Sequence, residues 1–398
     1  MSLRSAYNQF VSVTAMNLRN LPSRIGTSLV AVIGIGGVVA VLVSLLSMGE
    51  GFRAALDLSG RPDVAMILRG GSPDELSSSI SREEYNAIVI APGILRDDRG
   101  PLVAGELYTI VDLPMRSTGT GANVPFRGVG ERSAELRDGF RIVAGRMYQA
   151  GRNEVIVGRG AFSEFEGIGL GEQVKWGSTT WRVVGVFEAG GSVSESEVWT
   201  DAVVLRGVYR RGNTVQSVRA QLTSAAALQT VRSALERDPR LNVSVRSEEA
   251  FYADQSRILL ALIKYVGTTI AILMGIGAVF AALNTMYSAV SSRTREIATL
   301  RALGFGAGPV VTSVLLESAV LGLLGGIVGG LLVYFGLNGY RATTLNFGSF
   351  SQLTFAFTVT PQLLVTGLWY SLILGIVGGL LPGIRAARVP VTTGLREL

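Results

Sequence analysis

The sequence predicts a helical membrane protein with four transmembrane helices and a large extracytoplasmic α+β domain inserted between helices one and two. Only 17% of the 398 residues are charged, whereas soluble domains contain about 25%. Four apolar stretches are long enough to cross a bilayer, which takes about 20 residues. The segment between the first two stretches carries 26 basic and 27 acidic residues, a composition typical of a folded domain outside the lipid.

The apolar stretches set the predicted boundaries. The first stretch, at 25–48, carries no charge, and the second begins after Lys264. The predicted order is an interfacial helix at 1–24, a first span at 25–48, an external domain at 49–246, a stalk helix with the second span at 247–289, a cytoplasmic coupling helix at 290–309, a third span at 310–340, an external loop at 341–360, a fourth span at 361–384 and a cytoplasmic tail at 385–398.

The arginines predict the orientation of the chain. Three arginines and no acid precede the first span, and three arginines in the 290–309 loop face only Glu296. The positive-inside rule places such segments in the cytoplasm. Both termini and this loop are therefore predicted to be cytoplasmic, with residues 49–264 on the other side. The net charge of +6 comes from these flanks, so it does not indicate nucleic-acid binding.

The external segment has a mixed pattern. Short apolar runs bounded by glycines predict strands at 64–68, 154–158, 173–176, 180–187 and 241–245, with the third and fourth forming a hairpin. Ala227, Leu228, Val231 and Leu235 have helical spacing within 224–237. The strand-rich part is expected at about 115–220. Residues 247–283 contain no proline, which predicts one long helix from the stalk into the membrane.

Several kinds of chemistry are excluded by residue type. The chain has no His and no Cys, so it has no Ser-His-Asp or Cys-His nucleophile, thiolate zinc site, imidazole-bound metal or disulfide. Its two lysines, Lys175 and Lys264, precede Trp176 and Tyr265, so no Gly-Lys-Ser/Thr phosphate loop is present. No catalytic, cofactor-binding or metal site is predicted in these residues.

The cytoplasmic loop is the first candidate functional feature. Ile297, Leu300 and Leu303 recur every three residues and predict one apolar stripe on a short helix that ends at Gly304. The other faces carry charges: Arg293, Arg295, Glu296 and Arg301. Such a helix can lie on the lipid surface or enter a groove on a cytoplasmic partner.

The second candidate is Glu317, the one carboxylate in the third span. It lies about 10 Å into the span at helical rise, and a charge at the bilayer centre costs about 2.5–3.5 kcal/mol. Two roles are open: a proton or cation site, or an ion pair with Arg293, Arg295 or Arg301 that fixes the loop. The ion pair is favoured, because no second charge in the spans completes a relay.

Glycines recur every four residues in the last two spans. The two ladders are Gly322, Gly326 and Gly330, and Gly375, Gly379 and Gly383. Small residues at this spacing let helix backbones approach closely. Helix packing within the chain explains most of this pattern, and some of these glycines could lie at a dimer interface.

The run Arg-Thr-Arg-Glu-Ile-Ala-Thr-Leu-Arg-Ala-Leu-Gly at 293–304, followed by Glu317 and a glycine-rich span, resembles the signature of the MacB/FtsX-type ABC transporter permeases. Residues 17–24 are similar to the family's N-terminal helix, 155–158 and 181–187 to its external domain, and 382–396 to its ending. The resemblance covers nearly the whole chain. One departure is that MacB carries a fused ATPase, which this sequence does not contain.

The resemblance implies a MacB-like permease subunit of a type VII-like ABC transporter in the bacterial inner membrane, acting as a homodimer. A separate cytoplasmic ATPase dimer would bind ATP and Mg²⁺ and dock on the coupling helix, while Glu317 would have a mechanical role. Movement of the external domains would then drive export or efflux with a periplasmic adaptor and an outer-membrane protein.

Three alternatives stay open. A lipoprotein- or lipid-releasing permease of the same family would show an apolar groove in the external domain. A mechanotransmission regulator of a periplasmic partner enzyme is disfavoured, because such relatives have a smaller insert than the 216 residues at 49–264. A membrane enzyme would need external acids, for which Glu195 with Glu197 and Asp97 with Asp98 are the candidates.

Overall fold

The computed structural model describes residues 25–346 and 351–394. The interfacial helix predicted at 1–24 and the end of the predicted tail therefore lie outside the described residues. The chain divides into two compact units. We call them the helical unit, described over 25–50, 262–340 and 357–394, and the sheet unit, 51–261 and 341–356.

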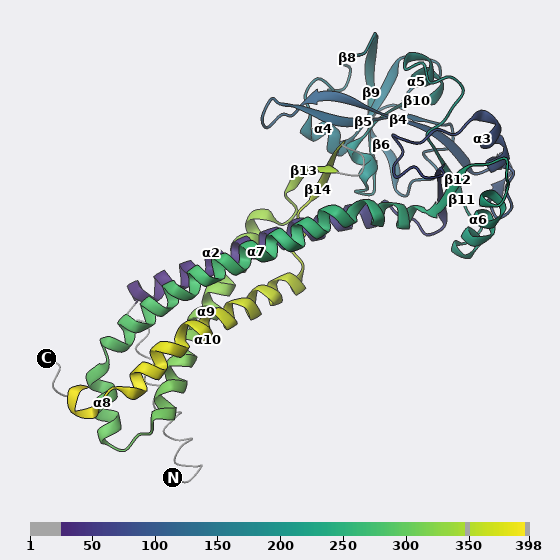
Figure 1. The fold of residues 1–398 in the computed structure, drawn as a ribbon. Helices are drawn as coiled ribbons and strands as arrows, with labels where there is room; N and C mark the ends of the chain where they lie inside the picture. The colour runs from purple at the N-terminus through teal and green to yellow at the C-terminus, as the bar shows by residue number, and fades with distance from the viewer. Residues whose placement is uncertain (1–24, 347–350, 395–398) are drawn as a thin grey trace. The chain divides into compact units, whose positions relative to one another are not determined.

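Six described helices contribute to the helical unit (Figure 1). They are α2 (Ile25–Asp57), α7 (Glu248–Ser291), α8 (Thr294–Ala302), α9 (Ala307–Leu337), α10 (Pro361–Arg388) and α11 (Val391–Gly394). Of these, α2 and α7 also extend into the sheet unit. Thr360 begins α10, because its side chain accepts a hydrogen bond from the backbone N–H of Leu363 and Pro361 follows at the first helical position.

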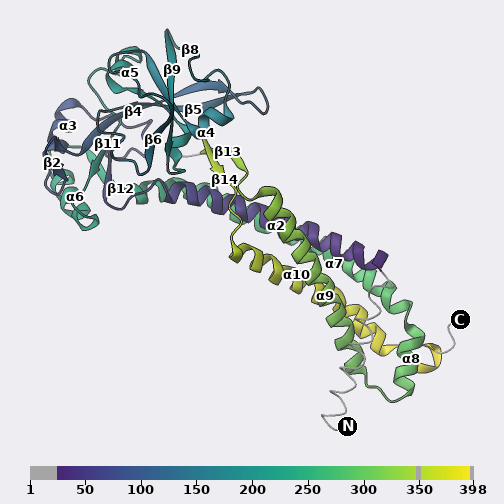
Figure 2. The same ribbon diagram turned by 180° about the vertical axis from the view of Figure 1, so that it is seen from behind.

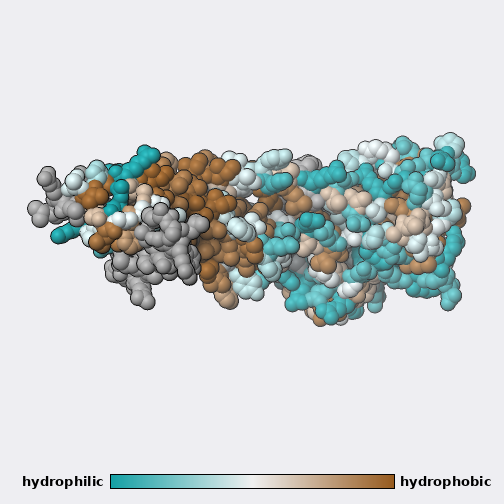
Figure 3. All heavy atoms as spheres, turned by 90° about the horizontal axis from the view of Figure 1, so that it is seen from below, coloured by the Kyte–Doolittle hydropathy of each residue, from teal (hydrophilic) through white to brown (hydrophobic). Residues whose placement is uncertain are grey.

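Four of these helices, α2, α7, α9 and α10, are long and apolar enough to cross a membrane. Their inward faces meet in a common core that includes Val39, Ala278, Val333 and Leu374, one from each helix. The outward faces are apolar as well, and Figure 3 shows a brown hydrophobic surface over the helices and a largely teal surface over the sheet unit. A helix that is apolar on all sides is typical of a membrane span.

The sheet unit is built on one ten-stranded sheet with strand order β12-β1-β11-β4-β5-β10-β7-β9-β6, and β8 pairs with β9. Its strands are β1 (Val64–Arg69), β4 (Val103–Pro114), β5 (Gly121–Val129), β6 (Phe140–Gly145), β7 (Glu154–Gly158), β8 (Gln173–Trp176), β9 (Thr179–Ala189), β10 (Val198–Asp201), β11 (Ser217–Gln221) and β12 (Val243–Ser247). Two small hairpins join β2 (Arg96–Asp97) to β3 (Gly100–Pro101) and β13 (Arg341–Asn346) to β14 (Ser351–Ala356).

Short helices cover this sheet. They are α3 (Arg82–Val89), α4 (Arg159–Glu164), α5 (Ala202–Val208) and α6 (Leu228–Glu236), with 3₁₀ turns η2 (Val193–Ser196) and η3 (Ala225–Ala227). One apolar core lies under α3 and α6 and includes Ile67, Val218 and Val231. Another lies around Phe126 and Trp181. The sheet therefore joins two halves, each with its own core.

The strands predicted at 64–68, 154–158, 173–176, 180–187 and 241–245 are confirmed as β1, β7, β8, β9 and β12, and β8 pairs with β9 as an antiparallel hairpin. The predicted helix within 224–237 is α6 preceded by η3. The strand-rich part begins earlier than the predicted residue 115, because β4 starts at Val103.

The structure differs most from the prediction at 341–360. Residues 341–346 and 351–356 form the antiparallel strand pair β13–β14, which belongs to the sheet unit although it follows the third predicted span (Figure 2). The backbone N–H of Thr354 donates to the Ser196 hydroxyl at 2.9 Å, and the Phe355 ring packs edge-on against Phe52 at 6.0 Å. The sheet unit is thus assembled from two separate parts of the chain.

Candidate functional site

The loop between α7 and α9 contains the helix α8, whose apolar stripe is buried at one end and exposed at the other. Ile297 is buried, Leu300 is half-buried and Leu303 is 73% exposed. Gly304 ends the helix at φ +94°, a conformation that favours glycine. The stripe therefore attaches the helix on one side and leaves Leu303 accessible on the other.

Three predicted charges of this loop take different positions. Arg295 and Glu296 are exposed. Arg301 turns back toward the end of α10, where its guanidinium donates to the carbonyl of Val389 at 2.7 Å. Ala298 on α8 and Ala386 on α10 are both buried. Because α8 is fastened in this way, Arg295, Glu296 and Leu303 form its accessible edge.

Arg293 is buried beneath this helix and pairs with Glu317. Its two terminal nitrogens donate to the two Glu317 carboxylate oxygens, each at 3.0 Å, and both residues are 5% exposed. This bidentate arrangement is the strongest geometry for an arginine and a carboxylate. Of the three arginines considered as partners for Glu317, the structure selects the one at the start of α8.

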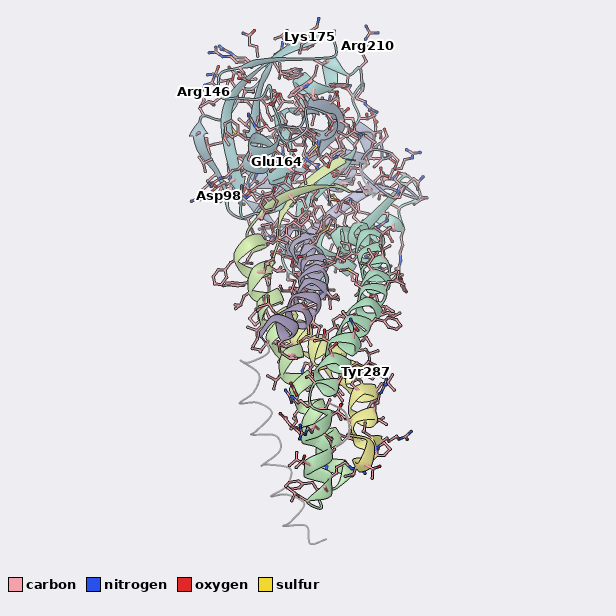
Figure 4. The ribbon with its side chains drawn as sticks, turned by 90° about the vertical axis from the view of Figure 1, so that its left-hand side faces the viewer. Asp98, Arg146, Glu164, Lys175, Arg210 and Tyr287 are labelled. Carbon is pink, nitrogen blue, oxygen red and sulfur yellow. The ribbon has the colours of Figure 1, made fainter. Side chains whose placement is uncertain are left out.

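A small groove surrounds this pair. Its lining comes from the end of α7, from α8 and from the start of α9: Met286, Ala289, Val290, Arg293, Glu296, Ile297, Leu300, Val310, Val314 and Glu317. Nearby, the Arg385 guanidinium lies over the Tyr287 ring, 5.5 Å from its centroid (Tyr287 is labelled in Figure 4). These contacts join α7, α8, α9 and α10 at one end of the helical unit.

The two predicted glycine ladders face each other between α9 and α10. A Cβ on Gly322 would lie 2.6 Å from the Ser371 carbonyl oxygen and 3.2 Å from the Gly375 Cα. On Gly375 it would lie 2.5 Å from the Ser318 carbonyl oxygen. Gly326 and Gly379 likewise leave room for the hydroxyls of Ser371 and Ser318. Contacts at Gly330 and Gly383 are looser, at 3.2 and 3.5 Å.

A second set of glycines on α9 was not predicted from the four-residue repeats. Gly325 and Gly329 lie on another face of α9 and pack against α2 at Gly36. A Cβ on Gly325 would lie 3.0 Å from the Val32 carbonyl oxygen, and one on Gly329 would overlap the Gly36 carbonyl oxygen. The pairs Gly325-Gly326 and Gly329-Gly330 signal this, because adjacent glycines place small residues on two helix faces.

We expect Gly329→Leu to lower the melting temperature of the full chain in detergent, because the added side chain must displace the α2 backbone. Overpacking of this kind costs about 1–3 kcal/mol. Gly336→Leu on the same helix is the matched control, since no atom lies within 4 Å of a Cβ there. Equal melting temperatures for the two variants would contradict the close approach of α9 and α2.

The sheet unit holds a buried charge cluster of three arginines and four glutamates: Arg127, Arg137, Arg219, Glu75, Glu106, Glu197 and Glu248. None of them is more than 8% exposed. They come from β4, β5 and β11, from the start of α7 and from the connections between elements. Buried charges persist only when they are paired and hydrogen-bonded.

Arg127 is the centre of the buried charge cluster. Its Nη1 donates to Glu75 at 2.6 Å and to Glu106 at 3.0 Å, and its Nε and Nη2 donate to Glu197 at 2.8 and 2.7 Å. Arg137 donates to both oxygens of Glu106, at 2.6 and 2.7 Å. Every guanidinium of the cluster thus has a carboxylate partner.

The arginines control the charge state of the cluster. Burial alone would raise the pKa of Glu106, but the attraction of Arg137, Arg219 and Arg127 together holds this pKa far below its usual range. Burial would also raise the pKa of Glu75, but the charges of Arg127 and Arg219 and the hydrogen bonds from Arg127 and Ser217 together lower it. Both carboxylates are therefore ionised at neutral pH.

The cluster also binds the first turns of α7 to the sheet. Arg219 on β11 pairs with Glu248 and donates to the Tyr252 hydroxyl at 3.0 Å. Gly60 lies against the same turn, since a Cβ there would be 2.6 Å from the Glu249 Cα. Glu248 therefore has an ionic role in addition to its place in the first turn of α7.

Three of the four external acids considered for catalysis have structural partners. Glu197 belongs to the buried charge cluster, and Glu195 accepts hydrogen bonds from the backbone N–H groups of Ala189 and Gly191 at 3.0 and 2.8 Å. Asp97 pairs with Arg132, and Asp98 lies at the edge of the sheet unit (Figure 4). Across 25–346 and 351–394, no group of three acidic side chains could hold a metal ion.

Two family assignments cover most of the chain. Residues 28–238 match the MacB-like periplasmic core domain, and residues 268–391 match the FtsX-like permease C-terminal domain. Together they include parts of both units and the loop that contains α8.

Individual relatives are similar over long alignments. The macrolide export ATP-binding/permease protein MacB of Bordetella avium is 26% identical over 97% of this chain and 60% of its own length. MacB 1 of Aeromonas hydrophila is 24% identical over 88% of this chain and 55% of its own. The chain thus spans somewhat more than half the length of these relatives. The ABC transporter permease YknZ of Bacillus subtilis is 28% identical over 38% of this chain and 36% of its own.

Two solved structures also match. The extracellular domain of YknZ aligns in full with 46% of this chain, at 17% identity and a TM-score of 0.34. The periplasmic region of MacB from Actinobacillus actinomycetemcomitans aligns over 91% of its length and 48% of this chain, at 14% identity and a TM-score of 0.35.

Proposed function

This chain belongs to the MacB/FtsX-type ABC transporter permease family, and we propose that it transmits the motion of a cytoplasmic ATPase to an extracytoplasmic domain. The family and the four apolar helices make it a membrane protein with an extracellular domain. Its charge distribution supports an orientation with the α8 loop in the cytoplasm.

The observation that carries this proposal is the continuity of α7. This helix runs for 44 residues, from Glu248 to Ser291. Its first turns belong to the sheet unit, where Arg219 holds Glu248. It ends two residues before Arg293, which pairs with Glu317. A helix held by buried ion pairs near each end can transmit displacement with little loss.

The accessible edge of α8 is the proposed docking surface for the ATPase. Leu303 is an exposed apolar side chain beside Arg295 and Glu296, while Ile297 anchors the helix. A force applied at Leu303 would reach α7 and α9 through the Arg293–Glu317 pair. In this proposal Ile297 attaches α8 to the neighbouring helices, and Leu303 contacts the ATPase.

The 398 residues contain no phosphate-binding lysine motif, so ATP and Mg²⁺ would bind outside them. We place this activity on a separate ATPase subunit that acts with two copies of the permease chain. The names of the MacB relatives support export as the task. A periplasmic adaptor and an outer-membrane duct would then complete the route across the envelope from the inner membrane.

A photo-crosslinking amino acid at position 303, introduced in the native host, tests the docking surface. We expect adducts to peptides of a protein that contains a Gly-x-x-x-x-Gly-Lys-Ser/Thr motif, which also requires α8 to be cytoplasmic. Leu303→Asp should reduce co-purification of that ATPase at least about tenfold, the loss of roughly 1.4 kcal/mol.

Leu58→Asp is the matched control, because Leu58 is 59% exposed and lies in the sheet unit. This variant should leave ATPase co-purification unchanged. Adducts only to lipid, or an undiminished ATPase yield with Leu303→Asp, would rule out the proposed docking surface.

A further inference from the structure

The sheet unit contains a large cleft that the coupling mechanism does not use. Its volume is about 1090 Å³, slightly above the range of about 300–1,000 Å³ that is usual for small-molecule sites. The walls come from α3, β4, α5 and the connections after β5 and β6. The cleft lies within one chain and one compact unit.

Small residues form much of its lining: Ala104, Gly105, Gly130, Ala150 and Ala202. Gly105 has a specific reason, because a Cβ there would lie 2.9 Å from the ring of Tyr85 and 3.0 Å from Val215. The missing side chain lets the Tyr85 ring lie against β4. An aromatic wall therefore stands beside a lining of small residues.

A second group of lining residues has larger apolar side chains. It includes Val103, Val129, Met147, Val203 and Val215. Val203 is 68% exposed although it sits on a short helix among apolar neighbours. A ligand with an apolar body would bury this side chain.

Only some of the charged groups of the cleft have hydrogen-bond or ion-pair partners. The carboxylate of Asp201 accepts from the backbone N–H groups of Gly151 and Val203, at 2.7 and 2.8 Å. Arg132 is bound to Asp97 and Glu135.

Two other arginines of the cleft, Arg82 and Arg206, have no carboxylate partner in the described part of the chain. The Nε of Arg206 is also buried without a hydrogen-bond acceptor there. Two carboxylates also line the cleft: the exposed Glu131, and Asp201, which already accepts two backbone hydrogen bonds. With Arg132 included, three arginines and two acids line the cleft, so the charge of its lining is positive.

Two phenols add neutral polar groups. Burial raises the pKa of Tyr85, and burial together with the charges of Asp201 and Glu106 raises that of Tyr148. Both hydroxyls stay protonated at neutral pH and add no negative charge that would oppose an anion.

We propose that this cleft binds a small amphipathic organic anion. The anionic group lies beside Arg206 and Arg82, and the apolar body lies against Val203 and Met147. An acceptor at Arg206 satisfies a buried donor that otherwise lacks one, and a hydrogen bond between an arginine and an anion is stronger than one between neutral groups. The proposal does not depend on the ATPase-coupled function.

Isothermal titration of the full chain in phosphatidylcholine nanodiscs, with empty discs subtracted, tests the site. The probe is 2-naphthalenesulfonate, and 2-naphthalenemethanol is its neutral counterpart. We expect one sulfonate per chain and at least about tenfold weaker binding of the alcohol, as loss of a charge-assisted hydrogen bond predicts. Arg206→Gln should weaken sulfonate binding to a similar degree, and Val203→Trp should abolish it.

Arg237→Gln is the matched control, since Arg237 is exposed and lies outside the cleft. It should bind the sulfonate as the wild type does, and melting curves should show that all variants are folded. Sulfonate heats equal to those of empty discs, or unchanged binding by folded Arg206→Gln or Val203→Trp, would overturn the proposal. Displacement of the sulfonate by a hexaglutamate peptide at lower concentration would also overturn it, in favour of a protein partner.

Discussion

Arg127→Met is expected to destabilise the sheet unit by about 3–5 kcal/mol, the cost of removing one partner from a buried ionic group. Methionine fills a similar volume but leaves Glu75 and Glu197 without their arginine partner. Denaturant unfolding of the full chain in detergent measures this loss, followed by tryptophan fluorescence. Trp176, Trp181 and Trp199 all lie buried in this unit.

Arg152→Met is the matched control, because Arg152 is an exposed arginine of the same unit. Its effect should stay within about 0.5 kcal/mol, as is usual for surface substitutions. An equally small effect of Arg127→Met would show that the buried charge cluster does not hold the sheet together.

The pH dependence of unfolding provides an independent readout of the Arg127→Met variant. In the wild type the pKa values of Glu75 and Glu106 are lowered from an ordinary value of 4.5. Their contribution is therefore complete above about pH 4.5 and is lost as the pH falls further. In Arg127→Met the unpaired carboxylates favour protonation, so its stability deficit should shrink as the pH falls from 7 toward 4.5.

Glu317→Gln is the second substitution with a large expected effect. It leaves the Arg293 guanidinium buried without a counter-charge, which costs up to about 3–5 kcal/mol. The melting temperature of the chain in detergent should fall, and ATPase stimulation in the assembled complex should be lost. Glu296→Gln, on the exposed edge of α8, is the control that should melt like the wild type.

The double variant Arg293→Gln with Glu317→Gln separates pairing from proton chemistry. Removing both charges should recover part of the melting temperature, because no unpaired charge remains. The pH optimum of ATP hydrolysis by the assembled complex should stay unchanged in both variants. A shifted pH optimum with Glu317→Gln would instead identify Glu317 as a proton site.

Local pattern was sufficient for much of the helical unit. The lengths of the uncharged stretches predicted the four long helices, since a bilayer requires about 20 apolar residues. The predicted ends agree with those of α2, α9 and α10 to within a few residues. The one exception is the end of α2, which continues to Asp57. The stripe of Ile297, Leu300 and Leu303 predicted α8. It did not predict that Ile297 would be buried and Leu303 exposed, because that depends on the neighbouring helices.

The sequence by itself determined the spans, the short helix between two of them, several strands and the family, because these depend on composition and on spacings within a few residues. Tertiary structure alone decided which charges meet. Arg127 finds Glu75 and Glu197 at separations of 52 and 70 residues, and Glu317 takes Arg293 from three nearby arginines. The β13–β14 strand pair belongs to the same compact unit as β1, which begins at residue 64. Long-range pairing depends on the geometry of the assembled sheet and helices, and no local periodicity encodes it.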